Sequence, residues 1–215
     1  MENIKQSEHT FIAGKTGSGK TMLAYYYLSG FEYVRVLDIK GLFDPVKAGF
    51  AKKEKVAVVT EFSKLASKAK KFPYIIYRPK FEELTAEYYD AFFQWCYLQR
   101  NCTVCVDEVM GLYDTAHKVL PYHKAILTRG RELNVNIFNL TQRPSSIPQI
   151  VISEATHIYV FNLNLKIDRQ KMADITGQED LLEMPGQYVF WYYNFGLDAP
   201  EKGRLNIKSK KEVKA

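Results

Sequence analysis

The chain has 215 residues, of which 47% are hydrophobic and 25% are charged, so it suits a single domain with a full core. No run approaches the ~18 consecutive apolar residues that a membrane span needs, and the N-terminal residues lack the apolar stretch of a signal peptide. These features exclude membrane-spanning and secreted classes, and we expect an intracellular protein.

The net charge of +6 is concentrated in one segment. Residues 47–71 contain eight lysines and two glutamates, which together equal the whole excess of positive charge. A second basic stretch covers 202–214. Clustered lysines are typical of proteins with a polyanion partner such as DNA or RNA. The alternative is a solvated helix face followed by a disordered tail, and charge alone does not decide between the two.

Strand-like and helix-like runs alternate along the chain without internal repeats. We expect strands at 10–13, 33–39, 56–60, 74–77, 103–106, 135–140, 157–163 and 187–193. We expect helices at 20–29, 62–70, 85–99, 121–132 and 168–175, with Thr85 as the N-cap of the third. This order predicts an α/β fold with a mostly parallel central sheet and helices on both faces. Ligands of such folds bind at the carboxyl ends of the strands.

The first strand leads into GKTGSGKT at 14–21, which matches the phosphate-loop pattern G-x-x-x-x-G-K-[ST] at every fixed position. Backbone N–H groups of such a loop, and of the helix that it opens, bind phosphates. We expect Lys20 to contact the β- and γ-phosphates of ATP and the Thr21 hydroxyl to bind Mg²⁺. The predicted cofactor-binding residues are Gly14, Lys15, Thr16, Gly17, Ser18, Gly19, Lys20 and Thr21.

A second apolar strand ends in two acids, Asp107 and Glu108. Asp107 fits the Walker B role of holding the metal, and Glu108 fits a general base that polarises the attacking water. Adjacent acids in this place are more typical of NTPases that hydrolyse their nucleotide than of kinases. Two exposed acids at a turn are the alternative.

The apolar strand at 135–140 ends in Thr141, Gln142 and Arg143, where a soluble core usually has a turn residue. An amide beside the Walker B strand can orient the attacking water. We therefore expect Gln142 to act as a sensor that distinguishes ATP from ADP, whereas a simple polar end of a strand is the alternative. Arg143 is expected either to anchor the loop or to face a neighbour.

Three arginines are candidates for an arginine finger that reaches the γ-phosphate of a neighbouring subunit: Arg78, Arg129 and Arg131. Gly130 would leave room for close approach of its flanking arginines. Ordinary ion pairs with surface carboxylates are the alternative for each of them. Asp38, at the end of the second strand, is expected at the same edge of the sheet and to support the site.

Cys102 and Cys105 have the CxxC spacing of a redox pair or of half a zinc site. Residues three apart in a strand point to opposite faces of the sheet, and the sequence has no second CxxC that would complete a metal site. Small buried hydrophobic residues are the favoured interpretation.

The segments GKTGSGKT, VLDIKG, VCVDE and LTQRPSSIP together resemble the FtsK–HerA superfamily of DNA-pumping ATPases, over about residues 9–165. The Walker A, Walker B and sensor-glutamine motifs of that family fall on Gly14–Thr21, on Asp107–Glu108 and on Gln142. The resemblance implies a RecA-like P-loop NTPase of the ASCE type that uses ATP and Mg²⁺. It also implies a hexameric ring that moves double-stranded DNA through its channel.

The phosphate loop begins at residue 14, so we expect no domain before the motor, one ATPase domain over 1–200 and a basic tail over 201–215. A stand-alone motor of this kind is similar to the genome-packaging NTPases of double-stranded DNA viruses with an internal membrane, including turreted icosahedral viruses of archaea. This likeness implies a capsid or membrane-vertex protein as partner, and a location in the host cytoplasm, the virion or both.

Three alternatives remain open. One is a cellular or plasmid HerA-like DNA pump or helicase. Another is a monomeric P-loop nucleotide switch or assembly factor, which the paired acids argue against because switches hydrolyse slowly. The last is a small-molecule kinase, which needs a lid, and no lid-like arginine cluster follows the first helix.

Overall fold

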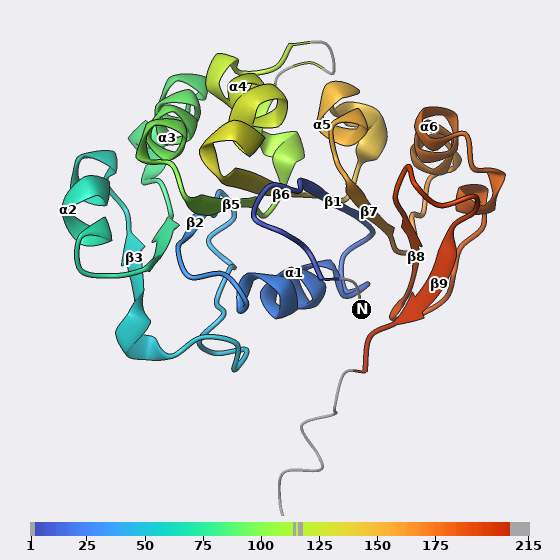
Figure 1. The fold of residues 1–215 in the computed structure, drawn as a ribbon, viewed down its shortest axis with the longest axis horizontal. Helices are drawn as coiled ribbons and strands as arrows, with labels where there is room; N and C mark the ends of the chain where they lie inside the picture. The colour runs from blue at the N-terminus through green and yellow to red at the C-terminus, as the bar shows by residue number, and fades with distance from the viewer. Residues whose placement is uncertain (1–2, 114, 116–117, 207–215) are drawn as a thin grey trace, which may run out of the picture.

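A nine-stranded sheet runs through the molecule in the order β3-β4-β2-β5-β6-β1-β7-β8-β9 (Figure 1). The structure is a computed structural model that describes residues 3–113, 115 and 118–206. Its strands are β1 (Thr10–Ala13), β2 (Val34–Leu37), β3 (Val56–Val59), β4 (Tyr74–Tyr77), β5 (Cys102–Val106), β6 (Val135–Thr141), β7 (His157–Val160), β8 (Val189–Tyr193) and β9 (Glu201–Arg204).

The strands from β1 to β7 pair in parallel, while β8 and β9 pair antiparallel at one end of the sheet. Parallel neighbours need crossover connections, which the helices supply. The helices are α1 (Lys20–Leu28), α2 (Leu65–Ala69), α3 (Ala86–Gln99), α4 (Pro121–Arg129), α5 (Ile150–Ser153) and α6 (Lys166–Thr176). The predicted α/β class with a mostly parallel sheet is confirmed.

Helices cover both faces of the sheet, but unequally. In Figure 1, α1 lies on one face and α2 to α6 lie on the other. The larger core contains Leu65 of α2, Phe92 of α3 and Met172 of α6. The smaller core contains Leu23 of α1 together with Phe43, which comes from the long connection between β2 and β3. The connection between β2 and β3 and helix α1 together cover this face of the sheet.

Local sequence explains where several elements begin and end. The Thr85 hydroxyl accepts the N–H of Tyr88 and caps α3, as expected. Pro121 occupies the first turn of α4, where its missing N–H costs no helical hydrogen bond. The helix expected to reach residue 132 ends at Arg129, and Gly130–Leu133 forms a 3-10 turn.

Two short elements were not expected from the sequence. Residues 201–204, assigned above to the basic tail, form β9 and pair with β8. Residues 150–153 form the short helix α5. The rest of the expected tail, 207–215, lies outside the described residues, and the division into a domain and a tail remains an expectation. Among the described helices, none has both the length and the apolar character needed to cross a membrane.

Cys102 and Cys105 are buried on opposite faces of the sheet, one in each core. In the part of the chain that the structure describes, no three Cys, His, Asp or Glu side chains gather as a metal site. Burial raises the pKa of the Cys105 thiol well above its usual range, which disfavours the reactive thiolate. The interpretation of these residues as small hydrophobic core residues is therefore preferred.

Two buried histidines lie between the start of β1, β6 and α4. The His9 Nδ1 accepts the N–H of Ile137 at 3.2 Å, and the His123 ring stacks on Phe93 with 4.5 Å between ring centroids. Burial lowers the pKa of His9 to about 4 and that of His123 to about 3. Both imidazoles are therefore neutral in the folded protein at neutral pH.

We expect the free energy of unfolding to fall as the pH is lowered from about 6.5 to about 4, because over this range the unfolded chain binds protons that the folded chain excludes from His9 and His123. Asp107, whose pKa is raised to about 6, contributes with the opposite sign over part of this range. Urea unfolding at pH 7 and pH 5 measures the slope. His9→Asn, which keeps a hydrogen-bond acceptor and does not titrate, should lose less stability on acidification; an unchanged loss would contradict this account.

Candidate functional site

The P-loop of residues 14–19 connects the carboxyl end of β1 to the start of α1. Gly17 and Gly19 adopt left-handed φ angles of 74° and 109°, which glycine accepts without strain. A Cβ on Gly19 would lie 2.7 Å from Leu205, the residue that follows β9. Backbone bonds from Gly14 to the Thr141 carbonyl (3.1 Å) and from Lys15 to the Asn162 carbonyl (2.8 Å) fix the loop to the ends of β6 and β7.

Lys20 is the first residue of α1, and its side chain lies over the loop. The ammonium is mostly buried and donates to the Lys15 carbonyl at 3.4 Å. Burial lowers the pKa of Lys20, while the carboxylates of Glu108 and Asp107 act in the opposite direction. A buried cation held by one long hydrogen bond at a helix N-terminus is well placed for a phosphate.

Asp107 follows β5 directly, and its Oδ1 accepts the hydroxyl proton of Thr21 at 3.1 Å. Burial raises the pKa of Asp107 to about 6; the Thr21 hydrogen bond opposes this shift and the charge of Asp38 adds to it. The two oxygen-bearing side chains thus meet beside the P-loop, and oxygen is the donor that Mg²⁺ prefers. Ser18, in the same loop, has a buried hydroxyl without a hydrogen-bond partner among the described residues. The residues present therefore fit a magnesium–nucleotide complex.

Both carboxylate oxygens of Glu108 are engaged. Oε2 accepts the Lys40 ammonium at 2.8 Å. Oε1 accepts the Thr141 hydroxyl at 2.9 Å and the backbone N–H of Gln142 at 3.2 Å. The side chain of Glu108 is 4% exposed. The carboxylate is therefore fixed between Lys40, which follows β2, and the carboxyl end of β6, and these two strands flank β5.

Gln142 reaches the P-loop, because the Thr16 hydroxyl donates to its Oε1 at 2.8 Å. Its backbone also contacts Glu108, as described above. The strand order places β6 between β5 and β1, so Gln142 lies between the Walker B acids and the phosphate loop. The sensor role of Gln142 stays a prediction, and its contact with Thr16 is the observation that supports it.

Arg78 and Arg143, which follow β4 and β6 at the same edge of the sheet as the P-loop, each form an ion pair within the chain. Arg78 Nε donates to Asp38 Oδ2 at 2.9 Å, and Asp38 also accepts the N–H groups of Leu42 and Phe43. Arg143 Nε donates to Asp168 Oδ2 at 3.0 Å. Arg143 thus anchors its loop to α6, and Arg78 with Asp38 holds the start of the connection after β2.

Arg129 and Arg131 lie at the opposite edge of the sheet, at the end of α4 and before β6 begins. Both are exposed, and Arg131 donates to the Thr156 hydroxyl at 3.1 Å. They are therefore separated from the P-loop of their own chain by the length of the parallel strands. A Cβ on Gly130 would lie 2.4 Å from the Val135 carbonyl, so this glycine allows α4 to meet β6, and its expected role beside the arginines stays a prediction.

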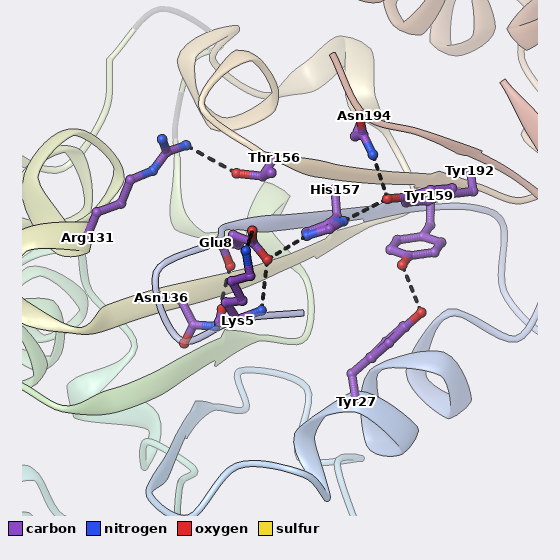
Figure 2. A network of polar contacts seen from close by, with 10 residues as sticks. All are labelled: Lys5, Glu8, Tyr27, Arg131, Asn136, Thr156, His157, Tyr159, Tyr192 and Asn194. Atoms are coloured by element: carbon purple, nitrogen blue, oxygen red, sulfur yellow. Dashed lines mark hydrogen bonds and ion pairs between the residues drawn. The ribbon is translucent and has the colours of Figure 1, made fainter. Parts of the chain in front are cut away.

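Figure 2 shows Arg131 and Thr156 beside a polar network at that opposite edge. His157 Nε2 contacts Glu8 Oε2 at 3.1 Å, and His157 Nδ1 contacts the Tyr192 hydroxyl at 2.9 Å. The hydroxyls of Tyr27 and Tyr159 lie 2.8 Å apart. This network ties the residues before β1, and the last turn of α1, to β7 and β8.

The structure adds Lys40, Thr141 and Leu205 to the candidate site. Lys40 and Thr141 hold Glu108, and Leu205 packs on Gly19 of the P-loop. The sequence contained a signal for Lys40 and Thr141, because each directly follows a strand that it predicts. Nothing in the sequence around Leu205 pointed to the P-loop.

Comparison with known protein families gives one match that covers most of the chain. The zonular occludens toxin (Zot) family matches residues 9–167, a range that contains the P-loop, the Walker B acids and Gln142. The chain belongs to the Zot family.

Individual relatives agree with the fold and with the predicted resemblance. The DNA packaging ATPase P9 of Enterobacteria phage PRD1 is 28% identical over 193 residues, which cover 86% of this chain and 77% of P9. The genome packaging NTPase B204 of Sulfolobus turreted icosahedral virus 2 superposes with a TM-score of 0.76 at 16% identity, over 96% of this chain and 100% of B204. The N-terminal domain of zonular occludens toxin from Neisseria meningitidis gives a TM-score of 0.52 at 18% identity, over 94% and 95% of the two chains.

These comparisons confirm the RecA-like P-loop NTPase fold and the likeness to packaging NTPases. The enzyme class expected from the sequence, an ATPase, is confirmed with them.

The pKa of Asp107 predicts a pH-dependent metal requirement. A carboxyl with a pKa of about 6 is mostly protonated at pH 5.5, so the Mg²⁺-dependent part of ATP affinity should fall about four-fold between pH 7.5 and pH 5.5. Titration of Mg²⁺ at fixed nucleotide concentration measures this change. Asp107→Asn should bind weakly at both pH values, which separates Asp107 from the titration of the nucleotide itself; an equal pH step in the variant would contradict the assignment.

The Lys40–Glu108 ion pair predicts that Lys40 restrains hydrolysis. In Lys40→Gln the carboxylate loses its charged partner and becomes a freer base, so ATP turnover should rise about three- to ten-fold. Steady-state phosphate release measures the rate, with Lys124→Gln as an exposed lysine control on α4. A loss of turnover as large as that of Glu108→Gln would instead place Lys40 in the catalytic machinery.

Proposed function

We propose that this protein is an ATP-driven translocase of double-stranded DNA that packages a viral genome into a preformed capsid. One observation carries the proposal: the Glu108 carboxylate contacts Thr141 and Gln142 directly, which joins the candidate base of the ATPase to the candidate sensor. Such a contact lets the state of the nucleotide alter the position of β6 and the segment after it, as a motor requires.

The roles of the site residues follow from their positions. Lys20 and the N–H groups of the P-loop bind the phosphates, and Thr21 with Asp107 would hold a Mg²⁺ ion that neutralises phosphate charge. Glu108 accepts a proton from the attacking water once it leaves Lys40. Gln142, which contacts Thr16 of the P-loop, senses the γ-phosphate.

The pairing of the nearby arginines supports a ring of subunits as part of the proposal, because among the residues named above no arginine near the P-loop of one chain is unpaired. Arg78 and Arg143 hold Asp38 and Asp168, whereas Arg129 and Arg131 face outward at the far edge. We propose that Arg129 or Arg131 completes the site of the neighbouring subunit, in a ring that we expect to be hexameric. Arg129 has the stronger case, since Arg131 already contacts Thr156.

The packaging role extends from two relatives, P9 of phage PRD1 and B204, whose names state DNA or genome packaging. With this role we propose a capsid or membrane-vertex protein as partner, and action in the host cytoplasm or at the virion. A cellular or plasmid DNA pump uses the same site, and a genome-linked capsid partner distinguishes the two. A monomeric nucleotide switch is the alternative of a different class.

The decisive experiment measures ATP hydrolysis with and without linear double-stranded DNA, at low and high salt. We expect DNA to stimulate hydrolysis, high salt to weaken the stimulation because phosphate contacts carry the grip, and Glu108→Gln to lower turnover roughly 10²-fold or more. Glu87→Gln, an exposed carboxylate on α3, is the matched control.

Hydrolysis that is indifferent to DNA at both salt concentrations would contradict the translocase and favour the nucleotide switch. Gel filtration with a non-hydrolysable ATP analogue then adds the assembly state, since a switch of this kind is expected to stay monomeric.

A further inference from the structure

The fold divides the eight lysines of residues 47–71 into two groups. Four of its lysines line a surface cavity of about 540 Å³ at the amino ends of β2, β3 and β4: Lys52, Lys55, Lys70 and Lys71. The other four lie outside that cavity: Lys47, Lys53, Lys64 and Lys68. The cavity is at the edge of the sheet opposite the P-loop, and in Figure 1 its neighbours α2 and β3 lie at the end of the sheet away from β8 and β9.

The cavity continues into two others along the same edge. It shares Ser29 and Phe31 with a cavity of about 400 Å³, and Tyr33 and Ala69 with one of about 210 Å³ that reaches Arg100. We call these three adjoining cavities the lysine groove.

The charge of the lysine groove is strongly one-sided. The four lysines are exposed and Arg100 lies at one end, whereas Glu32 is the one acid among the described residues that line the three cavities. Lys64, outside the groove, is neutralised by Glu61, but no ion pair is found for the four groove lysines within the described chain. A groove of this kind favours a polyanion.

A buried cation lies beneath the groove. Arg35, which also lines it, is 1% exposed. Its guanidinium donates to the Gln99 side chain at 2.8 Å and to the Val34 and Pro73 carbonyls at 3.0 and 2.6 Å. These described partners are neutral, so the charge is not balanced by a carboxylate. A buried charge without an opposite charge is costly, and an anion in the groove would offset part of that cost.

The assignment to double strands rests on the lysines of the groove, because its aromatic residues are partly half-buried and partly exposed. Phe31 and Phe50 pack against the core under α1, and Phe72 packs against the core on the other face. These three rings are half-buried. Tyr26 and Tyr33, which also line the groove, are 48% and 43% exposed and present faces on which unpaired bases can stack. The exposed lysines offer contacts to phosphates alone, and phosphates are what the outside of a duplex presents.

We propose that the lysine groove binds the phosphate backbone of double-stranded DNA. This inference rests on the proposed function and adds the surface that grips the substrate. Helix α1 supplies the connection: it begins at Lys20 in the P-loop and ends at Leu28, which lines the groove. A nine-residue helix spans about 13 Å, so a shift of the P-loop is carried through a rigid element to the groove.

The test compares two variants with the same change in charge, drawn from the same segment. The groove variant carries Lys52→Gln, Lys55→Gln, Lys70→Gln and Lys71→Gln; the control variant carries Lys47→Gln, Lys53→Gln, Lys64→Gln and Lys68→Gln. Fluorescence anisotropy measures the affinity for a labelled duplex across a salt series. Each phosphate contact adds about 0.9 to the slope of log K against log salt. The groove variant should therefore lose about three to four from the slope and the control about one or less.

Two further readouts separate the groove from folding and from the motor hypothesis. ATP hydrolysis without DNA should match wild type in both variants, while stimulation by DNA is lost in the groove variant alone. In wild-type protein, bound duplex should protect the four groove lysines, but not Lys124 on α4, from an amine-reactive label read by mass spectrometry.

The outcomes are distinguishable. If wild type binds no duplex at low salt, the translocase proposal fails and the groove proposal fails with it. If wild type binds duplex and the two variants have equal slopes, the groove proposal fails and the translocase stands. Tighter binding of a single strand than of the duplex, with the same dependence on the groove lysines, overturns the assignment to double-stranded DNA.

Discussion

The site is organised around one buried carboxylate. Glu108 has its oxygens divided between Lys40, which follows β2, and the polar end of β6, where Thr141 and Gln142 donate. A carboxylate that is 4% exposed needs such partners, because an unpaired buried charge is strongly destabilising. The same contacts place three neighbouring strand ends in a fixed relation. The arrangement therefore serves stability in the resting state and must change before Glu108 can act on water.

Local chemistry explains which parts of the site could be predicted from the sequence. The P-loop depends on glycine dihedrals and a helix N-terminus, both written within eight residues, and the acids follow their strand directly. The Lys40–Glu108 pair spans 68 positions and exists because β2 lies next to β5, a strand order that the sequence does not state. For the same reason Arg78 could be placed at a strand end, but its partner Asp38, 40 positions away, could not be chosen.

The class of the fold could be predicted from the sequence, but the edge strand β9 and the end of α4 could not. A fully buried strand such as β4 is indicated by a continuous run of aromatic and β-branched residues. The edge strand β9 is four residues long, mostly polar and exposed, and it exists only because β8 provides a pairing edge. Helix α4 stops earlier than expected because Gly130 lets the chain approach the Val135 carbonyl, a tertiary contact without a local signal.

The contact between Leu205 and Gly19 has a practical consequence for anyone who handles this protein. Leu205 is buried against the turn that ends the P-loop, and its N–H is bonded to the Tyr188 carbonyl at 2.9 Å. The residue that directly follows β9 is therefore packed against the nucleotide loop. A chain shortened to end before residue 205 lacks the side chain that covers Gly19. Shortened chains intended for nucleotide-binding studies should therefore keep Leu205.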